Sequence, residues 1–501
     1  MIKYVFLALF VALMVGIGIY SRKKVSDVND FFLGGRKMGA WISAFAYGTS
    51  YFSAVIFIGY AGSIGWGFGL SAIWIGIGNA LIGSLLAWLV LGKRTRRMTH
   101  EMDASTMPEF LEKRYDSKYL KIVTAIITFV FLVPYSASVY KGLGYLFTYT
   151  FGMPIEYYTY SMMAMAVLTG IYLLLGGYVA TAINNFVQGL IMIVGLILML
   201  YFVISHPVVG GISAGVTKLA AIPDEGANLV SAFSSMPLQL LSLVILTSLG
   251  VWGLPQMVHK FYTVENDKAI TNGTIISTLF AVLIGVGAYF TGSLGRLFLN
   301  NTAPANMDMV MPILLERALP EALMGIIIIL ILSASMSTLS SLVLVSSSSI
   351  ALDLLKGTLF KGMEKKQVMF IMRFLCALFV ALSFIVSVTD TAIVTLMSFS
   401  WGTVAGCFLA PFLFGLYWKG TTKAGAWAGL ISGFTISIGG AIYYGMNAKV
   451  APQIGAVAMV ISLVVVPLVS VVTAKLPDAH LEKVFPTIRN PIMEETGEAN
   501  I

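Results

Sequence analysis

The sequence has little charge and few cysteines. Only 11% of its 501 residues are Asp, Glu, Lys or Arg, against about 25% in soluble domains. A soluble globular fold is therefore excluded. Both cysteines, Cys376 and Cys407, lie within apolar runs, which excludes a disulfide framework and a CxxC metal motif. We expect both to serve only in packing.

The sequence also lacks recognisable catalytic, metal-binding, ATP-binding and channel motifs. No catalytic nucleophile with a partnering base is recognisable, and the four histidines show no metal-ligand spacing. No Gly-rich phosphate loop ends in Lys-Ser or Lys-Thr, so ATP is not expected to power this chain. A filter signature or charged ring of a channel is absent as well. The sequence predicts a protein that is not an enzyme and has no metal beyond a transported ion.

Long apolar runs fill the chain. The hydrophobic share is 58% and the mean hydropathy is +0.89, which is typical of an all-α polytopic membrane protein of one domain. Runs of about 20 residues can each span a bilayer as a helix. We predict about thirteen such helices, near 2–20, 39–66, 70–92, 119–148, 159–176, 184–206, 237–257, 271–299, 319–351, 367–387, 392–417, 424–445 and 452–474.

The basic residues orient these helices. All 31 Lys and Arg fall in alternate loops and their helix ends, or in the C-terminal tail, except Lys3, Lys141, Lys218, Arg296, Arg317 and Lys449. By the positive-inside rule the N-terminus is outside and the C-terminus cytoplasmic. The plasma membrane is the expected location, with the lipid bilayer as partner. The net charge of +8 is then explained without nucleic acid, and no obligatory protein partner is implied.

A serine-rich stretch, Ile331–Ser349, interrupts one apolar run. Ser333, Ser337, Ser340 and Ser341 follow the spacing i, i+4, i+7 and i+8, so they line one helix face. Hydroxyls without a carboxylate at membrane depth suit a weakly held alkali cation. The alternative is that small residues let helices pack closely.

Two spans carry helix-breaking residues. The span 39–66 contains Gly48, Thr49 and Ser50 near its middle, and the span 237–257 contains Gly253 and Pro255. Broken backbone survives in lipid only where it lines a cavity or a ligand. Helices 2 and 7 lie five apart, as expected if helices 2–6 and 7–11 form an inverted repeat. A secondary transporter fits these features best, and a membrane sensor that only binds a solute is the alternative.

Several motifs resemble the sodium/solute symporter family, whose bacterial members include proline and pantothenate carriers. The likeness runs from about residue 25 to 430, and the motifs are DFFLGGRKMG, SYFSA, MPEFLEKRYDS, GGYVATAINNFVQG, SMSTLSS and GLYWKGTTKAGAWAG. Two further stretches are more similar to the pantothenate and monocarboxylate branch of the family; they are LGVWGLPQ and FTGSLGRLF. The resemblance implies a LeuT-type five-plus-five inverted repeat and sodium-coupled uptake by alternating access.

The resemblance also implies a division of the chain. Helix 1 is peripheral, 39–206 forms the first repeat and 237–417 the second. Residues 424–474 form further peripheral helices, and 475–501 form a cytoplasmic tail.

The family's sodium site implies specific ligands here. Carbonyls at the helix 2 break and oxygens of helix 9 bind the ion, and the matching residues are Thr49, Phe52, Ala334, Ser337 and Thr338. A second cation site in some members would correspond to Asn185, Ser340 and Ser341, with Ser337 shared. Those members have an aspartate where this chain has Asn185, which predicts a single sodium ion as the coupling ion.

The family's solute cavity lies between the broken helices and helix 4. The matching positions are Ser53, Tyr135, Thr247 and Trp252, and core packing is the alternative for each. Tyr51 replaces an aspartate of proline carriers and Thr247 replaces a tryptophan, which argues against proline. We expect a small organic solute: a monocarboxylate, a pantothenate-like acid or an amino acid.

Lys141 is a basic residue deep inside a predicted span. Its stem could reach the outer interface. Otherwise it pairs with a carboxylate solute, or it replaces a coupling cation in a proton-coupled carrier. No Asp or Glu is expected at its depth, so a protein partner for the charge is not expected.

Overall fold

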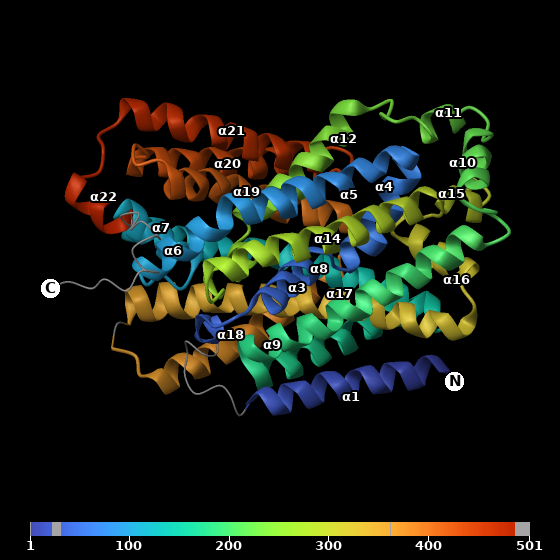
Figure 1. The fold of residues 1–501 in the computed structure, drawn as a ribbon, viewed down its shortest axis with the longest axis horizontal. Coiled ribbons are helices and arrows are strands. Elements are labelled where there is room, and N and C mark those ends of the chain that lie inside the picture. The colour runs from blue at the N-terminus through green and yellow to red at the C-terminus, as the bar shows by residue number, and fades with distance from the viewer. Residues whose placement is uncertain (1, 23–31, 361, 486–501) are drawn as a thin grey trace.

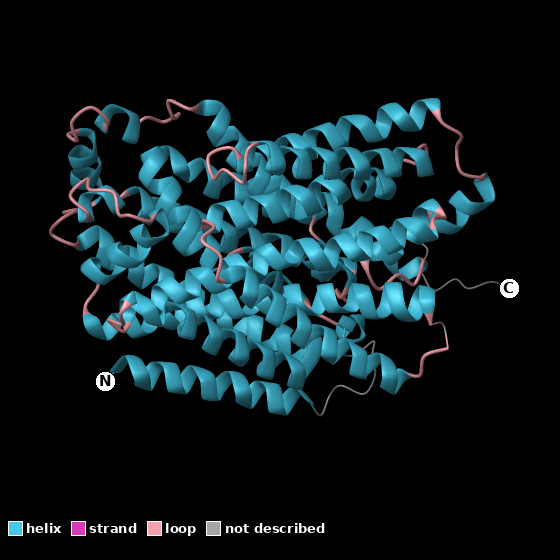
Figure 2. Ribbon diagram, turned by 180° about the vertical axis from the view of Figure 1, so that it is seen from behind, coloured by secondary structure: helices cyan, strands magenta, loops and turns pink. Residues whose placement is uncertain are grey.

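The computed structural model describes residues 2–22, 32–360 and 362–485, and within this part of the chain every regular element is a helix (Figures 1 and 2). Inside α9 the side chains of 165, 168, 169 and 171–180 are not described. The loop 21–38 and the tail from 475 onward therefore lie partly outside the described residues.

Ten α-helices make up the first half of the chain. These are α1 (Ile2–Arg22), α3 (Ala40–Tyr51), α4 (Ala61–Phe68), α5 (Ile73–Ala80), α6 (Lys93–Glu101), α7 (Met107–Tyr115), α8 (Lys118–Thr150), α9 (Tyr158–Ser205), α10 (Ile212–Ala220) and α11 (Gly226–Leu229). Shorter 3-10 and π segments between them are η1 (Gly34–Arg36), η2 (Val55–Tyr60), η3 (Gly69–Ala72), η4 (Leu81–Leu86), η5 (Trp88–Gly92) and η6 (Ile155–Tyr157).

The second half has the same all-helical character. Its α-helices are α12 (Pro237–Val244), α13 (Pro255–Tyr262), α14 (Asp267–Ser293), α15 (Gly295–Phe298), α16 (Val310–Ala318), α17 (Glu321–Ser348), α18 (Lys365–Ser387), α19 (Ile393–Tyr417), α20 (Lys423–Tyr443), α21 (Ala451–Val472) and α22 (Asp478–Val484). The shorter segments are η7 (Ile245–Leu249), η8 (Gly250–Gly253), η9 (Met307–Met309) and η10 (Ser349–Leu359).

Each predicted span falls on helical backbone. Within the described residues, nine helices are long and apolar enough to cross a membrane, or ten when the bent pair α12–α13 counts as one span. This number is below thirteen partly because some predicted spans run together. The fifth and sixth both lie in α9, and Val55–Glu101 forms one stretch of 47 helical residues.

Gly69 divides that stretch into two spans. Forty-seven residues of straight helix would measure about 70 Å, well beyond a bilayer. Gly69 has φ 57° and ψ −137°, and an added Cβ would lie 2.2 Å from the Leu229 carbonyl oxygen. Only glycine fits both this backbone and this close approach. The second and third predicted spans therefore correspond to α3–α4 and α5–α6.

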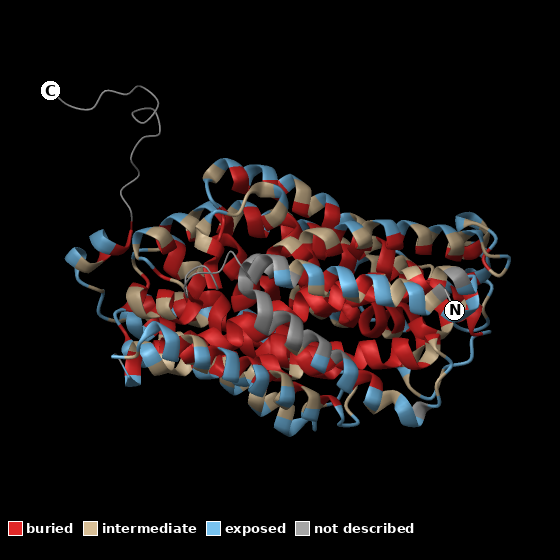
Figure 3. Ribbon diagram, turned by 90° about the horizontal axis from the view of Figure 1, so that it is seen from below, coloured by how far each residue is buried: buried red, intermediate tan, exposed pale blue. Residues whose placement is uncertain are grey.

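The serine-rich helix α17 lies at the centre of the bundle. Its most apolar window is 89% buried and that of α19 is 94% buried, whereas α18, α20 and α21 reach only 33–39%. Figure 3 shows the buried residues concentrated in the middle of the molecule. The helices with exposed apolar faces are those that would meet lipid.

The two ends of the bundle differ in their elements. The end with α6, α7 and α22 is opposite the end with α10, α11 and α15 (Figure 1). Following the charge distribution, we name the first the inner end and the second the outer end. Arg94, Arg96, Arg97 and Arg114 all belong to α6 and α7.

Both predicted helix breaks are present. After α3 ends at Tyr51, Phe52 takes an extended conformation with φ −100° and ψ 99°. In the second case, Leu254 is extended between η8 and α13, and the helix axes bend by 45°. The inner ends of the two broken helices are joined, because Met38 and Val264 form an isolated β-bridge. In that bridge Met38 N–H donates to the Thr263 carbonyl at 3.0 Å, and Glu265 N–H donates to the Met38 carbonyl at 3.1 Å.

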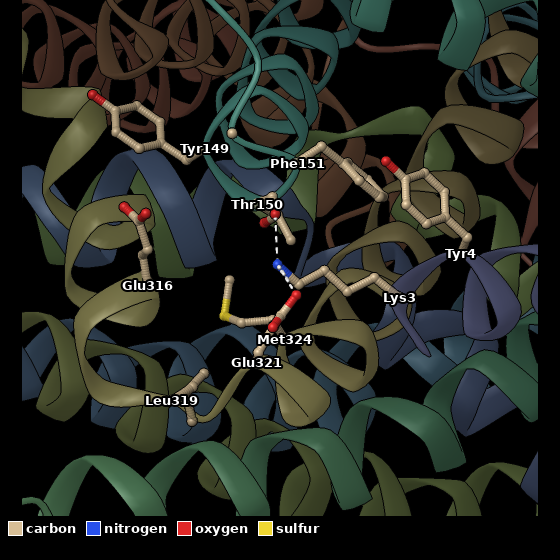
Figure 4. A pocket seen from close by; sticks show the side chains of 10 residues that line it. Lys3, Tyr4, Tyr149, Thr150, Phe151, Glu316, Leu319, Glu321 and Met324 are labelled. Carbon is tan, nitrogen blue, oxygen red and sulfur yellow. Dashed lines mark hydrogen bonds and ion pairs between the residues drawn. The ribbon is translucent and has the colours of Figure 1, made fainter. Parts of the chain in front are cut away.

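Helix α1 packs along the outside of the bundle against α9 and α17 (Figure 1). Phe10 and Met14 are its buried side chains. At its outer end a pocket separates α1 from α8 and α17, and Lys3 points across it (Figure 4). The Lys3 ammonium donates to the Thr150 carbonyl at 3.0 Å and lies 3.6 Å from the Glu321 carboxylate.

Candidate functional site

The helix 2 break and the serine-rich helix meet at the centre of the molecule. The Ser337 hydroxyl donates to the Thr49 carbonyl at 2.8 Å and to the Ala334 carbonyl at 2.9 Å. The Thr338 hydroxyl lies 3.4 Å from the Thr49 carbonyl and 3.1 Å from the Ala334 carbonyl. All four residues are fully buried. The structure therefore brings together four of the five residues expected to bind sodium.

Phe52, the fifth residue, lies at the break itself. Its N–H still bonds the Gly48 carbonyl at 3.1 Å, but its own backbone leaves the helical conformation. Residues at such a break have carbonyls released from the intrahelical ladder. The sequence signal for this break was Gly48, Thr49, Ser50 and Ser53 in the middle of the predicted span, and the helix does end within that stretch.

The donor set suits a monovalent cation. Two hydroxyls and three carbonyls supply oxygen without formal charge, and unwound backbone in transporters coordinates sodium in this way. The Ser337 and Thr338 hydroxyls already contact the Thr49 and Ala334 carbonyls. Reorienting two O–H bonds would therefore direct these four oxygens at an ion. We refer to these five residues, which the sequence predicts as sodium ligands, as the predicted sodium site.

A second group of polar side chains lies one turn further along α17. The Ser340 and Ser341 hydroxyls both donate to the Ser337 carbonyl at 3.0 Å. Asn185 on α9 is fully buried, and neither its amide oxygen nor its amide nitrogen has a hydrogen-bond partner in the described part of the chain. We refer to Ser340, Ser341 and Asn185, the residues that the sequence predicts for a second cation, as the predicted second site.

Tyr135 connects the predicted solute residues to the predicted sodium site. Its hydroxyl is near enough to the Ser53 and Thr338 side chains to interact with both electrostatically. Ser53 directly follows the helix 2 break and is fully buried. A solute held by Tyr135 or Ser53 would thus be adjacent to a sodium ligand, which is the arrangement that coupling requires.

Thr247 and Trp252 lie on the second broken helix, and the polar atoms of both side chains are hydrogen-bonded to other residues of the protein. The Thr247 hydroxyl donates to the Asn79 side-chain oxygen at 2.8 Å. The Trp252 indole N–H donates to the Ile82 carbonyl at 2.9 Å. The Tyr51 hydroxyl donates to the Thr247 carbonyl at 2.7 Å, which ties the two broken helices together. Because their polar atoms are already bonded to protein groups, these residues would contribute to the wall of a solute site and would not donate hydrogen bonds to the solute.

An aromatic cage next to this wall includes a residue that the sequence reasoning missed. The Trp401 ring lies 5.5 Å from the Tyr135 ring and 6.3 Å from the Tyr51 ring. Its indole N–H is buried without a hydrogen-bond partner among the described residues. A tryptophan in the middle of the span 392–417 was the available signal. We refer to Tyr51, Tyr135 and Trp401 as the aromatic cage.

Lys141 lies outside the aromatic cage. It is six residues beyond Tyr135 on α8, or about 9 Å nearer the outer end. It lines a cavity of about 600 Å³ at that end, together with Tyr145, Asp308 and Asp390. Its ammonium donates to the Thr389 carbonyl.

The expectation that no carboxylate would share the depth of Lys141 is wrong. Asp308 and Asp390 line the same cavity, because the loops around η9 and before α19 fold inward over α8. Asp308 is 2% exposed and accepts the Ile393 N–H at 3.1 Å. Burial raises the pKa of Asp308 to about 6, although the Ile393 N–H and the nearby Lys141 oppose this rise.

Lys260 is a second buried cation that the sequence reasoning missed as a site residue. It lies on α13 and is 1% exposed. Its ammonium donates to the Ser341 hydroxyl at 2.9 Å. The layout of spans assigned it to a loop, because the helix break shifts α13 relative to an unbroken span.

The fold resembles a solved sodium-coupled transporter. A Na+-coupled sialic acid symporter in a substrate-bound outward-open state aligns with a TM-score of 0.76 over 95% of this chain and 98% of its own, at 17% identity. At that identity the likeness establishes the fold alone, which is of the LeuT type with broken helices 2 and 7.

Two bacterial proteins are similar along most of their length. The osmoregulated proline transporter OpuE of Bacillus subtilis (strain 168) is 29% identical, with 85% of each chain covered. A sodium/proline symporter of Staphylococcus aureus (strain bovine RF122 / ET3-1) is also 29% identical, covering 98% of this chain and 96% of the relative. Residues 31–433 match the family described as the sodium:solute symporter family. With this match over most of the chain, and with a fold that joins a helix break to a hydroxyl-bearing helix, the protein belongs to the sodium:solute symporter family.

Proposed function

We propose that this protein is a sodium-coupled symporter that imports a small organic solute by alternating access. The observation that carries the proposal is the contact of the Ser337 and Thr338 hydroxyls with the Thr49 and Ala334 carbonyls. Buried neutral oxygens from two helices can replace the water shell of sodium without holding it too tightly to release. The packing alternative for the serines does not account for hydroxyls aimed at the carbonyls of a broken helix.

The solute is expected to carry a carboxylate. The Trp401 indole N–H and the Tyr135 and Ser53 hydroxyls are donors around the aromatic cage. Donors of this kind suit an acceptor group, while the rings provide apolar contact for a short carbon chain. A monocarboxylate, a pantothenate-like acid or an amino acid would meet both conditions.

The names of the relatives bear on the choice of solute. Both 29% identical relatives are proline carriers, so proline belongs among the solutes tested. Tyr51 and Thr247, which stand where proline carriers have an aspartate and a tryptophan, favour a different solute. Tyr51 is committed to the Thr247 carbonyl, so it offers no charge to a bound amino group.

Alternating access would use the two helix breaks as hinges. In the described structure the aromatic cage is shut off from solvent, since Tyr51, Tyr135 and Trp401 are each at most 1% exposed. The cavity that Lys141 lines is at the outer end, and Met38 and Val264 form their β-bridge at the inner end. We infer that the N-terminus is outside the cell and the C-terminus is cytoplasmic.

Uptake by the purified full-length protein in proteoliposomes tests the proposal. A panel of labelled carboxylates, amino acids including proline, and sugars is offered with a sodium gradient, with a proton gradient, or with neither. We expect concentrative uptake of one carboxylate-bearing solute with sodium only. Liposomes with Ser337→Ala protein are the matched control and should need far more sodium.

The alternatives give different results in the same assay. Uptake driven by protons alone would indicate a proton-coupled carrier and would direct attention to Lys141. Solute binding without concentrative uptake under either gradient would contradict the proposal and indicate a membrane sensor.

A further inference from the structure

A polar pocket lies at the outer end of the molecule, where α1 meets the end of α8, the end of α16 and the start of α17 (Figure 4). Its volume is about 430 Å³. Three charged side chains line it, namely Lys3 of α1, Glu316 of α16 and Glu321 of α17. One cation and two carboxylates leave the pocket with an excess of negative charge. We refer to it as the interfacial pocket.

Two side chains on one side of the interfacial pocket can still donate hydrogen bonds. The Lys3 ammonium has three N–H groups, and its neighbours are the Thr150 carbonyl at 3.0 Å and the Glu321 carboxylate at 3.6 Å. Thr150 is 4% exposed, and its hydroxyl has no hydrogen-bond partner in the described part of the chain. A buried hydroxyl without a partner is costly. Lys3 and Thr150 therefore suit a ligand with acceptor oxygens.

Glu316 gives the interfacial pocket the opposite character on another side. It is exposed, and none of the ion pairs among the described residues includes it. In Figure 4 the Glu316 and Lys3 side chains reach the pocket from different sides. An ionised carboxylate only accepts hydrogen bonds, so Glu316 suits a group with N–H donors. A ligand that carries both an anionic group and a primary ammonium matches the whole pocket.

The surroundings place this pocket at the level of lipid headgroups. It is formed by the first residues of α1 and α17 and by the last residues of α8, which are all ends of apolar helices. Tyr4, Tyr149 and Phe151 also line it, and the rings of Tyr4 and Phe151 are 5.0 Å apart. Aromatic side chains gather where membrane helices enter the headgroup region. The ligand with both charges that is present at this level is a phospholipid.

An apolar cavity of about 400 Å³ lies further along α1, between α1, α9 and α17. Phe6 and Phe10 of α1, Val194 of α9 and Ile329 of α17 are among its lining residues, which are all hydrophobic. Phe6 is three residues beyond Lys3, so this cavity begins about 5 Å deeper along the helix. A polar pocket at the interface followed by an apolar cavity at membrane depth matches the order of headgroup and acyl chain in a phospholipid.

We propose that the interfacial pocket binds the headgroup of a phosphatidylethanolamine and that the apolar cavity receives one of its acyl chains. Lys3 and Thr150 donate to the phosphate oxygens, and the ammonium of the lipid donates to Glu316. Phosphatidylcholine has no N–H group for Glu316, and phosphatidylglycerol adds a negative charge to a pocket that already has an excess. The bound lipid joins the outer helix α1 to α8 and α17.

Lipid binding to the purified full-length protein tests the inference and requires neither the solute nor sodium. The protein is stripped of lipid in detergent, and the dioleoyl form of phosphatidylethanolamine, phosphatidylcholine or phosphatidylglycerol is added. Native mass spectrometry gives the Kd of the first lipid bound, and the Tm is measured in parallel. We expect phosphatidylethanolamine to bind about tenfold more tightly than phosphatidylcholine, the effect of one hydrogen bond to a charged group. It should also raise the Tm most.

Variants separate the two halves of the headgroup site. Glu316→Gln changes an exposed residue, so it should fold normally, and it should lose most of the preference for phosphatidylethanolamine over phosphatidylcholine. Lys3→Met should weaken both lipids alike, because both carry the phosphate. Asp224→Asn, at an exposed position between α10 and α11 at the same end of the molecule, is the matched control and should keep the preference of the wild type.

Three results would overturn the inference. The first is equal binding of phosphatidylethanolamine and phosphatidylcholine by the wild type. The second is an unchanged preference in Glu316→Gln. The third is tightest binding of phosphatidylglycerol, because the charge of Lys3 would then outweigh the carboxylates. All three would leave the proposed sodium-coupled transport standing, since the assay measures lipid binding alone.

Discussion

Hydroxyl oxygens on α17 contact the carbonyls freed by the helix 2 break, and single-residue changes there should act on sodium alone. We predict that Ser337→Ala and Thr338→Ala each weaken sodium activation of uptake by about ten- to hundredfold, since each lost ligand is worth on the order of 1–3 kcal/mol. Ser349→Ala is the matched control, because that hydroxyl only bonds the Val345 carbonyl at 2.9 Å within its own helix. The sodium concentration for half-maximal uptake measures the effect. Similar small changes at all three positions would favour the packing role of the serines.

Lys141 should act on the solute before it reaches the aromatic cage. Its ammonium lines the outer cavity, where it can attract an anion. We predict that Lys141→Met raises the KM for an anionic solute by about tenfold and spares an uncharged analogue. Initial uptake rates for both compounds at several pH values measure this. Equal loss for the two compounds would rule out pairing with the solute. A flattened pH profile with altered sodium dependence would point to a cation-substituting role.

Asp308 should make the stability of the protein depend on pH. Its pKa in the folded protein is raised by burial from 3.8 to about 6, so the native state binds the proton more tightly than the unfolded chain. Burying the charged carboxylate lowers the free energy of unfolding. This destabilisation is absent below the unfolded pKa, is complete above pH 6, and amounts to at most about 3 kcal/mol. We predict that Asp308→Asn raises the Tm at pH 7.5 and has less effect at pH 5. A larger gain at pH 5 would contradict this origin.

At the scale of elements, α4 and α14 cross with their backbones almost in contact. An added Cβ on Gly292 would lie 1.8 Å from the Ala61 carbonyl oxygen, and no side-chain motion can relieve a clash with backbone. We predict that Gly292→Ala lowers the Tm markedly and reduces the yield of folded protein. Gly439→Ala is the control, because nothing lies within 4 Å of its added Cβ. Alanine there should be neutral or stabilising by up to about 1 kcal/mol. Equal Tm values for both variants would contradict the close crossing.

The helix elements also show what a sequence can and cannot predict. Gly253 and Pro255 identified the second break, and the spacing of Ser337 and Ser341 identified the face of α17 that meets the first. These signals are local, because each depends on backbone geometry within one helix. Trp401 and Lys260 were missed since their roles depend on which helices become neighbours. Asp308 was missed for the same reason, as its loop reaches Lys141 only after the chain folds back.

At the scale of the whole molecule, we expect the charges around the central site to set the number of sodium ions transported per solute. The amide of Asn185 offers an ion a dipole in place of a full charge, and the difference is large in the low-dielectric interior. We predict one sodium per solute in transport. Paired ²²Na⁺ and labelled-solute fluxes, or reversal potentials in proteoliposomes, measure the ratio. A ratio of two would require a second complete cation site.

The bridge between Met38 and Val264 offers a way to measure how often the inner end of the protein opens. Two backbone amides, those of Met38 and Glu265, are bonded only across the gap between the broken helices. Opening the inner end must separate these strands of backbone and admit water to both N–H groups. Their rate of exchange with deuterium therefore counts inward openings, at equilibrium and without any label or solute. Conditions that hold the transporter closed on the inside should slow both amides together.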